Sequence, residues 1–193
     1  MPCASEERRK PMLAKWILWT VAAVQLLFLA NIIREYEAVR TDGQLYKLEL
    51  QVRDPYDLFR GNFLELSMKE DRIKMPDWQP GWDDKFYVKL QADTKTGFAK
   101  PVAVSKDFPG GDNWIQVRNS GGMVMEGSDT LLMFAYPMDR YYINEDVAKT
   151  TEEKWNKALQ DSNSRCWMEF RLRKDKAVIT DLKINGKSLR EIR

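Results

Sequence analysis

The pattern of hydrophobic and polar positions changes once along this chain, near residue 34. Residues 16–33 form a mostly apolar run of 18 residues without a charged side chain. At a rise of ~1.5 Å per residue, a helix of this length measures about 27 Å, close to the ~30 Å hydrocarbon core of a bilayer. Because Lys15 can snorkel to the interface, residues 12–14 can extend the span. The pattern predicts a transmembrane helix over residues 12–33.

Beyond the span, apolar residues alternate with polar ones, which is the period of a half-buried strand. The helix is expected to continue as a linker over residues 34–43, since Asp42-Gly43 is a stop signal. Alternation then appears in residues 46–52, 86–92 and 166–172, and turn signals recur every ~8–12 residues, among them Gly121-Gly122, which is expected to separate two strands. This predicts a mainly β domain over residues 44–193, built as an antiparallel sandwich or a barrel-like fold.

One stretch departs from the strand pattern. Residues 144–160 contain neither glycine nor proline, and Asn144 can cap a helix there. Trp155 falls on the apolar face of this helix, and we interpret it as a core residue. The predicted fold is therefore mainly β with one helix, plus the N-terminal transmembrane helix.

Charge at the N-terminus predicts the orientation of the span. Residues 1–11, interpreted as a cytoplasmic tail, contain Arg8, Arg9 and Lys10, and Lys15 follows. Basic residues stay on the cytoplasmic side, so the β-rich domain is expected outside the cytoplasm. A cleaved signal peptide is the competing interpretation. Its apolar region usually runs only ~7–15 residues, and no small-x-small cleavage pattern is present, so a retained signal anchor is favoured.

The residue inventory excludes several classes of function. The formal net charge is +2, and all of it lies in the first 15 residues, so nucleic acid is not expected as a partner. The chain has no histidine, which excludes Ser-His and Cys-His pairs and zinc sites that need imidazole. Cys3 and Cys166 are expected on opposite sides of the membrane, which excludes a disulfide between them. We expect no metal and no cofactor.

The remaining chemistry rests on carboxylates or on a Ser-Lys pair. Ser67 and Lys69 lie two positions apart on one face of a predicted strand, as in a possible Ser-Lys dyad. Asp83-Asp84 is more typical of a solvated surface, and residues 110–113 lack the ligands of a calcium or phosphate loop. No catalytic residue is assigned. Five tryptophans lie outside the span, and Trp78 and Trp82 fall in a predicted loop where they could contact a ligand or glycan.

The segment from Asp54 to Met68 is the feature around which the domain is interpreted. It begins with a turn at Asp54-Pro55 and turns again at Gly61-Asn62. Arg60 lies within reach of Asp54 and Asp57, so it can tie the loop together. A strand follows, in which Leu64, Leu66 and Met68 share one face.

This segment resembles the signature of the GDYXXLXY family of bacterial membrane-anchored proteins. Asn62, Phe63 and Met68 stand where the family motif has Asp, Tyr and Tyr, so an acid-base role of that Asp could not be repeated here. Residues 141–143 and 184–186 also look familiar. The resemblance implies an architecture at the bacterial inner membrane, with a periplasmic domain, and no established activity. The residues that carry it are Asp54, Pro55, Asp57, Arg60, Gly61, Asn62, Phe63 and Leu66.

Two amides inside the apolar run suggest how the protein works. Gln25 lies at the midpoint of the span and Asn31 further along it. A polar amide in hydrocarbon is unfavourable without a partner, so both are candidates for helix association. The hypothesis is a non-enzymatic accessory subunit that associates with another integral membrane protein. A membrane-surface hydrolase with Ser-Lys or carboxylate chemistry, and a ligand- or glycan-binding sensor domain, stay open as alternatives.

Overall fold

The computed structural model describes residues 9–51, 63–126 and 129–191. The chain divides into two compact units, residues 1–38 and residues 39–193. The order of elements is α1 (Arg9–Asp42), β1 (Gln44–Gln51), β2 (Phe63–Glu65), β3 (Ser67–Met68), β4 (Arg72–Lys74), β5 (Lys85–Ala92), β6 (Ala99–Ser105), β7 (Trp114–Glu126), β8 (Asp129–Ala135), β9 (Arg140–Tyr142), α2 (Glu145–Gln160), β10 (Cys166–Arg173), β11 (Lys176–Ile184) and β12 (Lys187–Ser188). The predicted class, mainly β with one helix after an N-terminal apolar helix, is confirmed.

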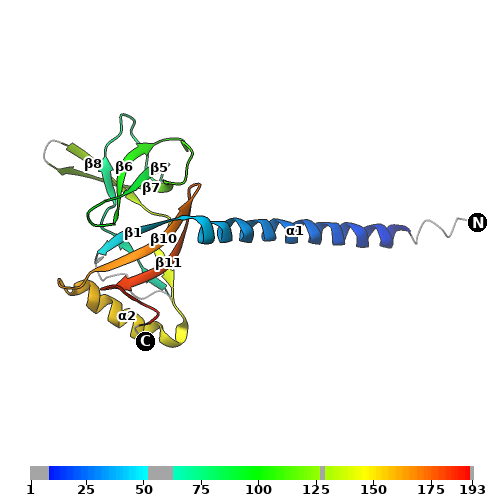
Figure 1. Ribbon diagram of the computed structural model, residues 1–193. Coiled ribbons are helices and arrows are strands. Elements are labelled where there is room, and N and C mark those ends of the chain that lie inside the picture. The colour runs from blue at the N-terminus through cyan, green and yellow to red at the C-terminus, as the bar shows by residue number, and fades with distance from the viewer. Residues whose placement is uncertain (1–8, 52–62, 127–128, 192–193) are drawn as a thin grey trace, which may run out of the picture. The chain divides into compact units, whose positions relative to one another are not determined.

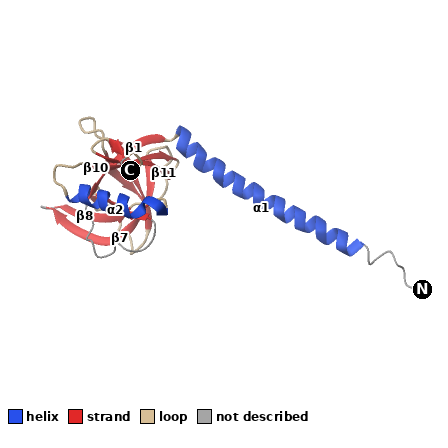
Figure 2. Cartoon of the chain, turned by 90° about the horizontal axis from the view of Figure 1, so that it is seen from below, coloured by secondary structure: helices blue, strands red, loops and turns tan. Residues whose placement is uncertain are grey.

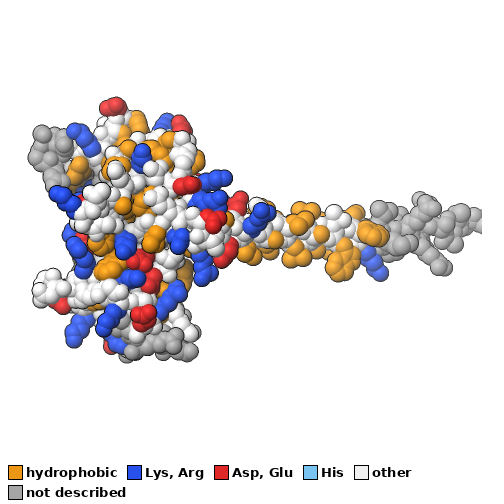
Figure 3. Space-filling model, viewed as in Figure 1, with side chains coloured by type: hydrophobic (Ala, Val, Ile, Leu, Met, Phe, Trp, Pro, Cys, Tyr) orange, Lys and Arg blue, Asp and Glu red, His pale blue; other side chains and the backbone are white. Residues whose placement is uncertain are grey.

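Helix α1 is one continuous helix, and its stretch from Lys15 is long and apolar enough to cross a membrane by length and composition. Hydrophobic side chains cover its surface along the apolar run (Figure 3). The helix ends at Asp42, where the Gly43 N–H donates to the Val39 carbonyl at 2.9 Å. A Cβ at position 43 would clash with that carbonyl oxygen, so glycine is required for the tight exit into β1.

Two five-stranded antiparallel sheets make up most of the second unit (Figure 1). The first has the order β12-β11-β10-β1-β3 and the second the order β4-β8-β7-β5-β6. The edge strands β4 and β6 of the second sheet also contact each other, so this sheet curls in a barrel-like manner. A two-stranded ribbon of β2 and β9 completes the unit, and α2 lies beside β10 and β11.

The core is formed by the alternating residues that the sequence pattern indicated. Tyr46 and Leu48 on β1, and Met168 and Phe170 on β10, are buried, and the rings of Tyr46 and Phe170 stack at 5.8 Å. Trp155 of α2 is 1 % exposed and belongs to the same cluster, which confirms its interpretation as a core residue. In the view of Figure 2, helix α2 is drawn in front of the strands of the β unit.

Two details of the strand pattern were wrong. Gly121-Gly122 does not separate two strands, because β7 runs through both glycines with an irregularity between Asn119 and Met123. The predicted single strand after the signature is broken into β2 and β3. The break occurs at Leu66, whose N–H donates to the Asp139 carbonyl at 2.8 Å, so β2 pairs with β9 while β3 pairs with β1.

Candidate functional site

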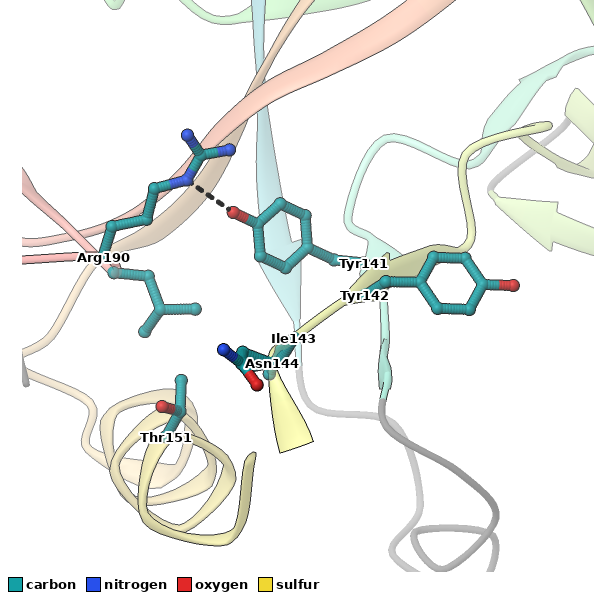
Figure 4. A pocket seen from close by; sticks show the side chains of 7 residues that line it. Tyr141, Tyr142, Ile143, Asn144, Thr151 and Arg190 are labelled. Atoms are coloured by element: carbon teal, nitrogen blue, oxygen red, sulfur yellow. Dashed lines mark hydrogen bonds between the residues drawn. The ribbon is translucent and has the colours of Figure 1, made fainter. Parts of the chain in front are cut away.

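A pocket of about 220 Å³ lies where β9, α2 and the segment after β12 meet (Figure 4). β9 and α2 follow each other closely in the sequence, whereas the segment after β12 comes from near the end of the chain. Its lining combines apolar side chains with a few hydrogen-bonding groups, which is typical of small-ligand sites. The lining residues are Tyr141, Tyr142, Ile143, Asn144, Thr151, Leu189 and Arg190.

The alternation of side chains along β9 determines which tyrosine faces Arg190. Successive side chains on a strand point to opposite faces, so Tyr141 is directed towards Arg190 while the ring of Tyr142 points away (Figure 4). The Nε of Arg190 donates to the Tyr141 hydroxyl at 3.1 Å. This hydrogen bond raises the pKa of Arg190, and the nearby Asp181 carboxylate acts in the same direction. The guanidinium is thus held charged and oriented at the pocket rim.

The other walls of the pocket contain both apolar and polar residues. Leu189 is buried, and its N–H donates to the Leu182 carbonyl at 2.8 Å, which fixes the chain between β12 and Arg190. Leu189 and Ile143 supply apolar surface, while Thr151 of α2 and Asn144 are polar residues of the lining. The site can therefore receive a group with an apolar part and an end that accepts hydrogen bonds.

Most of the predicted signature residues lie outside the described residues, namely Asp54, Pro55, Asp57, Arg60, Gly61 and Asn62. Their assigned roles stay predictions. The described end of the segment contacts the pocket wall, because Phe63 pairs with Tyr142 across the β2–β9 ribbon. The rings of Phe63 and Tyr142 lie 5.9 Å apart, and the Arg140 guanidinium lies 5.0 Å from the centre of the Phe63 ring. Leu66 is buried in the core.

Ser67 and Lys69 have separate partners in the structure. The Lys69 ammonium lies 3.5 Å from Glu49, and its backbone N–H donates to the Glu49 carbonyl. The Ser67 hydroxyl accepts from the Gln51 amide at 3.5 Å. Each side chain therefore has its own partner on β1, and the described geometry gives no support to a Ser-Lys dyad.

The two loop tryptophans differ sharply in environment. Trp78 is partly buried and packs edge-on against Phe86 at 5.9 Å, which indicates a core role. Trp82 is 78 % exposed, and its ring lies over Gly121, where a Cβ would clash with it. The buried Asn119 holds this loop by donating to the carbonyls of Pro80 and Gly81 at 3.1 and 2.7 Å. Trp82 is therefore exposed enough to contact a ligand. The packing of Trp78 against Phe86 indicates a structural role instead.

The acidic residues that were considered for chemistry have structural roles. Asp83 contacts Arg118 at 3.3 Å, and Asp84 accepts from the Gly81 N–H at 2.6 Å. Within the part of the chain that the structure describes, no cluster of three or more His, Cys, Asp or Glu side chains could hold a metal. The Cys166 thiol is free and buried, and burial raises its pKa to about 11, so it is not a reactive thiolate.

The two amides of α1 are exposed on the helix surface. Neither Gln25 nor Asn31 makes a side-chain hydrogen bond to another residue that the structure describes. Thr20 differs, because its hydroxyl donates to the Trp16 carbonyl within the helix at 2.8 Å. The helix therefore satisfies the Thr20 hydroxyl but neither of the two amides.

Sequence reasoning missed the pocket. Arg190 and Tyr141 lie 49 positions apart and meet only through the fold. The sequence feature that points to the pocket is the Tyr-Tyr-Ile run at 141–143, which is part of the resemblance to the GDYXXLXY family. Nothing in the sequence pattern distinguished Arg190 from the other basic residues near the C-terminus.

One comparison with known proteins identifies a family. The model of the GDYXXLXY protein family matches residues 25–183, which is most of the chain. No curated protein and no solved structure was found to match. The match runs from the apolar part of α1 through β11, so it includes the signature, the β2–β9 ribbon and α2. The chain belongs to the family of GDYXXLXY proteins.

Proposed function

We propose that this protein is a membrane-anchored, non-enzymatic accessory subunit that associates with another integral membrane protein. Helix α1 is its anchor in the bacterial inner membrane, and the β-rich domain lies on the periplasmic side. The basic residues Arg8, Arg9, Lys10 and Lys15 before the apolar run support this orientation. Arg34 and Arg40 follow the run, so the charge bias is modest.

The observation that carries the proposal is the unsatisfied amide of Gln25. It lies at the centre of the apolar run, about 13 Å from either end at ~1.5 Å per residue, so interfacial water does not reach it easily. Its side chain makes no hydrogen bond to another described residue. Because an unpaired amide in hydrocarbon is unfavourable, a hydrogen bond to a second helix lowers its free energy by about 0.6–2 kcal/mol. Ala22, three positions before Gln25 and on the same side of the helix, permits a close approach of that helix.

The position of Asn31 indicates the kind of partner. At 100° per residue, the six positions from Gln25 to Asn31 place these amides about 120° apart around the helix. A single straight partner helix covers one of these directions, whereas a bundle can contact both. Asn31 lies nearer the end of the run, where water can also solvate it. A multi-span protein therefore fits the two amides better than a second copy of this chain.

Affinity purification of the tagged full-length chain in mild detergent, followed by mass spectrometry, tests the proposal. We expect a multi-span membrane protein to co-purify, and Gln25→Leu to weaken this association about 3- to 30-fold. Thr20→Val is the matched control, because the Thr20 hydroxyl already has an acceptor within the helix. Equal recovery with wild type, Gln25→Leu and Asn31→Leu would show that α1 is only an anchor.

A ligand-binding sensor domain is the second candidate function. Two observations favour it, the pocket beside Arg190 and the exposed, positioned indole of Trp82. The two functions are separable by experiment. A sensor domain would bind its ligand equally well when Gln25 is replaced by leucine, whereas the accessory subunit would lose its partner.

A further inference from the structure

We propose that the pocket formed by β9, α2 and the segment after β12 binds a carboxylate that carries a short apolar chain. This inference goes beyond the proposed function, since it assigns a ligand class to the extramembrane unit and does not depend on α1. It rests on the orientation of one guanidinium, on the balance of apolar and polar groups, and on the size of the space.

Arg190 is placed to bind an anion with two hydrogen bonds. Its Nε is occupied by the Tyr141 hydroxyl at 3.1 Å, which fixes the plane of the guanidinium. Its two terminal nitrogens make no hydrogen bond to another residue that the structure describes. A guanidinium whose end is available matches the two oxygens of a carboxylate, and such a pair is stronger than one between neutral groups. Tyr141 is thus a positioning residue, and Arg190 is the binding residue.

The charged groups near Arg190 are compatible with the binding of an anion. Arg190 is the sole charged side chain among the described residues that line the pocket. The carboxylate that acts on it, Asp181, already accepts from the Ser188 hydroxyl at 2.8 Å and from the Leu182 N–H at 2.9 Å. Among the described residues Arg190 makes no ion pair with Asp181 or another carboxylate, so its terminal nitrogens stay available to an added carboxylate.

The size and the walls of the pocket define the rest of the ligand. Its volume of about 220 Å³ exceeds the ~150 Å³ of an apolar cavity that holds one benzene ring. Ile143 and Leu189 offer apolar surface, and Thr151 lies on the wall formed by α2. One guanidinium beside apolar walls suits a monocarboxylate better than a phosphate, which is usually held by several donors. The ligand is either a free short-chain carboxylate or the C-terminus of a peptide that ends in an apolar residue.

Calorimetric titration of the detergent-solubilised full-length chain tests this assignment with two pairs of probes. The first pair is 4-methylpentanoate and its neutral amide, and the second is N-acetyl-L-leucine and N-acetyl-L-leucinamide. We expect each acid to bind with a Kd of about a millimolar or lower, and each amide at least tenfold more weakly. Tighter binding of 4-methylpentanoate identifies a free carboxylate as the source, and tighter binding of N-acetyl-L-leucine identifies a peptide C-terminus.

Variants separate binding from folding. Arg190→Gln should abolish the preference for acid over amide, and Tyr141→Phe should reduce that preference several-fold while the melting temperature stays near wild type. Lys187→Gln removes one positive charge three positions earlier and is the matched control. If acids and amides bind equally well to wild type, if no probe binds, or if Arg190→Gln keeps the acid preference, the proposal is wrong.

Discussion

The sheet of β1 and β10 and the centre of the apolar run of α1 differ in how their polar side chains are paired. On the sheet of β1 and β10, Glu169 contacts both Lys47 and Lys183, and Glu49 contacts Lys69. In the apolar run, Gln25 has no partner among the described residues. The difference teaches that the sheet pairs these charges within its own chain, whereas the apolar run leaves Gln25 available to the partner helix that we propose. If α1 spans the membrane as we propose, a partner is to be sought first at Gln25.

The largest expected change in stability comes from removing a side chain from the core of the β unit. Trp155 is 1 % exposed, so Trp155→Ala should lower the free energy of unfolding by about 3–5 kcal/mol. Trp82→Ala is the control on an exposed ring and should change it by less than about 0.5 kcal/mol. Thermal or urea unfolding of the two variants measures both values. Equal losses would mean that Trp82 is a structural residue as well.

The Trp155 indole adds a second comparison. Its Nε1 is buried and has no hydrogen-bond partner among the described residues. Trp155→Phe would remove this unsatisfied donor and is therefore expected to cost much less than Trp155→Ala. A loss as large as that of the alanine variant would show that the indole nitrogen has an acceptor after all.

An intermediate effect is expected from the paired charges of the sheet. The Glu169 side chain is 13 % exposed and lies 3.6 Å from Lys47 and 3.5 Å from Lys183. Glu169→Gln should reduce the free energy of unfolding by about 1–2 kcal/mol, because it removes the charge that both ammonium groups contact. Glu153→Gln on the exposed side of α2 is the control and should have little effect. A stability equal to wild type would mean that the sheet does not depend on this cluster.

The smallest effect concerns a polar group that the β unit satisfies poorly. Burial raises the pKa of Asp71 above its ordinary value of 3.8, and the neighbouring Arg72 opposes this shift. Its Oδ1 lies 3.3 Å from the Arg72 Nε but makes no hydrogen bond to a described residue. Because the pKa is raised in the folded state, the ionised carboxylate costs stability at neutral pH. That cost disappears as the pH falls through the folded pKa towards 3.8.

Asp71→Asn should therefore raise the melting temperature slightly at pH 7 and leave it unchanged below pH 3.8, where wild-type Asp71 is protonated in both states. Thermal melts of both proteins at the two pH values measure this difference. A lower melting temperature of the variant at pH 7 would show that the ion pair with Arg72 outweighs the cost of burial.

The sequence predicted the elements whose periodicity is strong. Tyr46, Leu48 and Leu50 alternate with polar residues over a whole strand, and all three are buried as expected. Helix α2 was found because residues 144–160 lack glycine and proline, and its observed range is Glu145–Gln160. Local composition decides such elements, so one sequence is enough to predict them.

What the sequence could not predict depends on contacts between distant residues. Gly121-Gly122 has the local composition of a turn, yet the Trp82 and Met133 side chains occupy the space beside these glycines within β7. The pocket depends on Tyr141 meeting Arg190, and no periodicity reports such a pair. Both errors have the same origin, because tertiary contacts override local preference.

Photocrosslinking within α1 tests the central claim most directly. Leu29 lies about 40° from Gln25 around the helix, whereas Leu26 lies about 100° from Gln25 and 140° from Asn31. With a photoreactive residue at Leu29 of the full-length chain in native membranes, we expect an adduct with an integral membrane protein. The adduct should be lost with Gln25→Leu and kept with Thr20→Val, and a photoreactive residue at Leu26 should give little. Equal adducts at both positions, or a Leu29 adduct that persists with Gln25→Leu, would contradict association through Gln25.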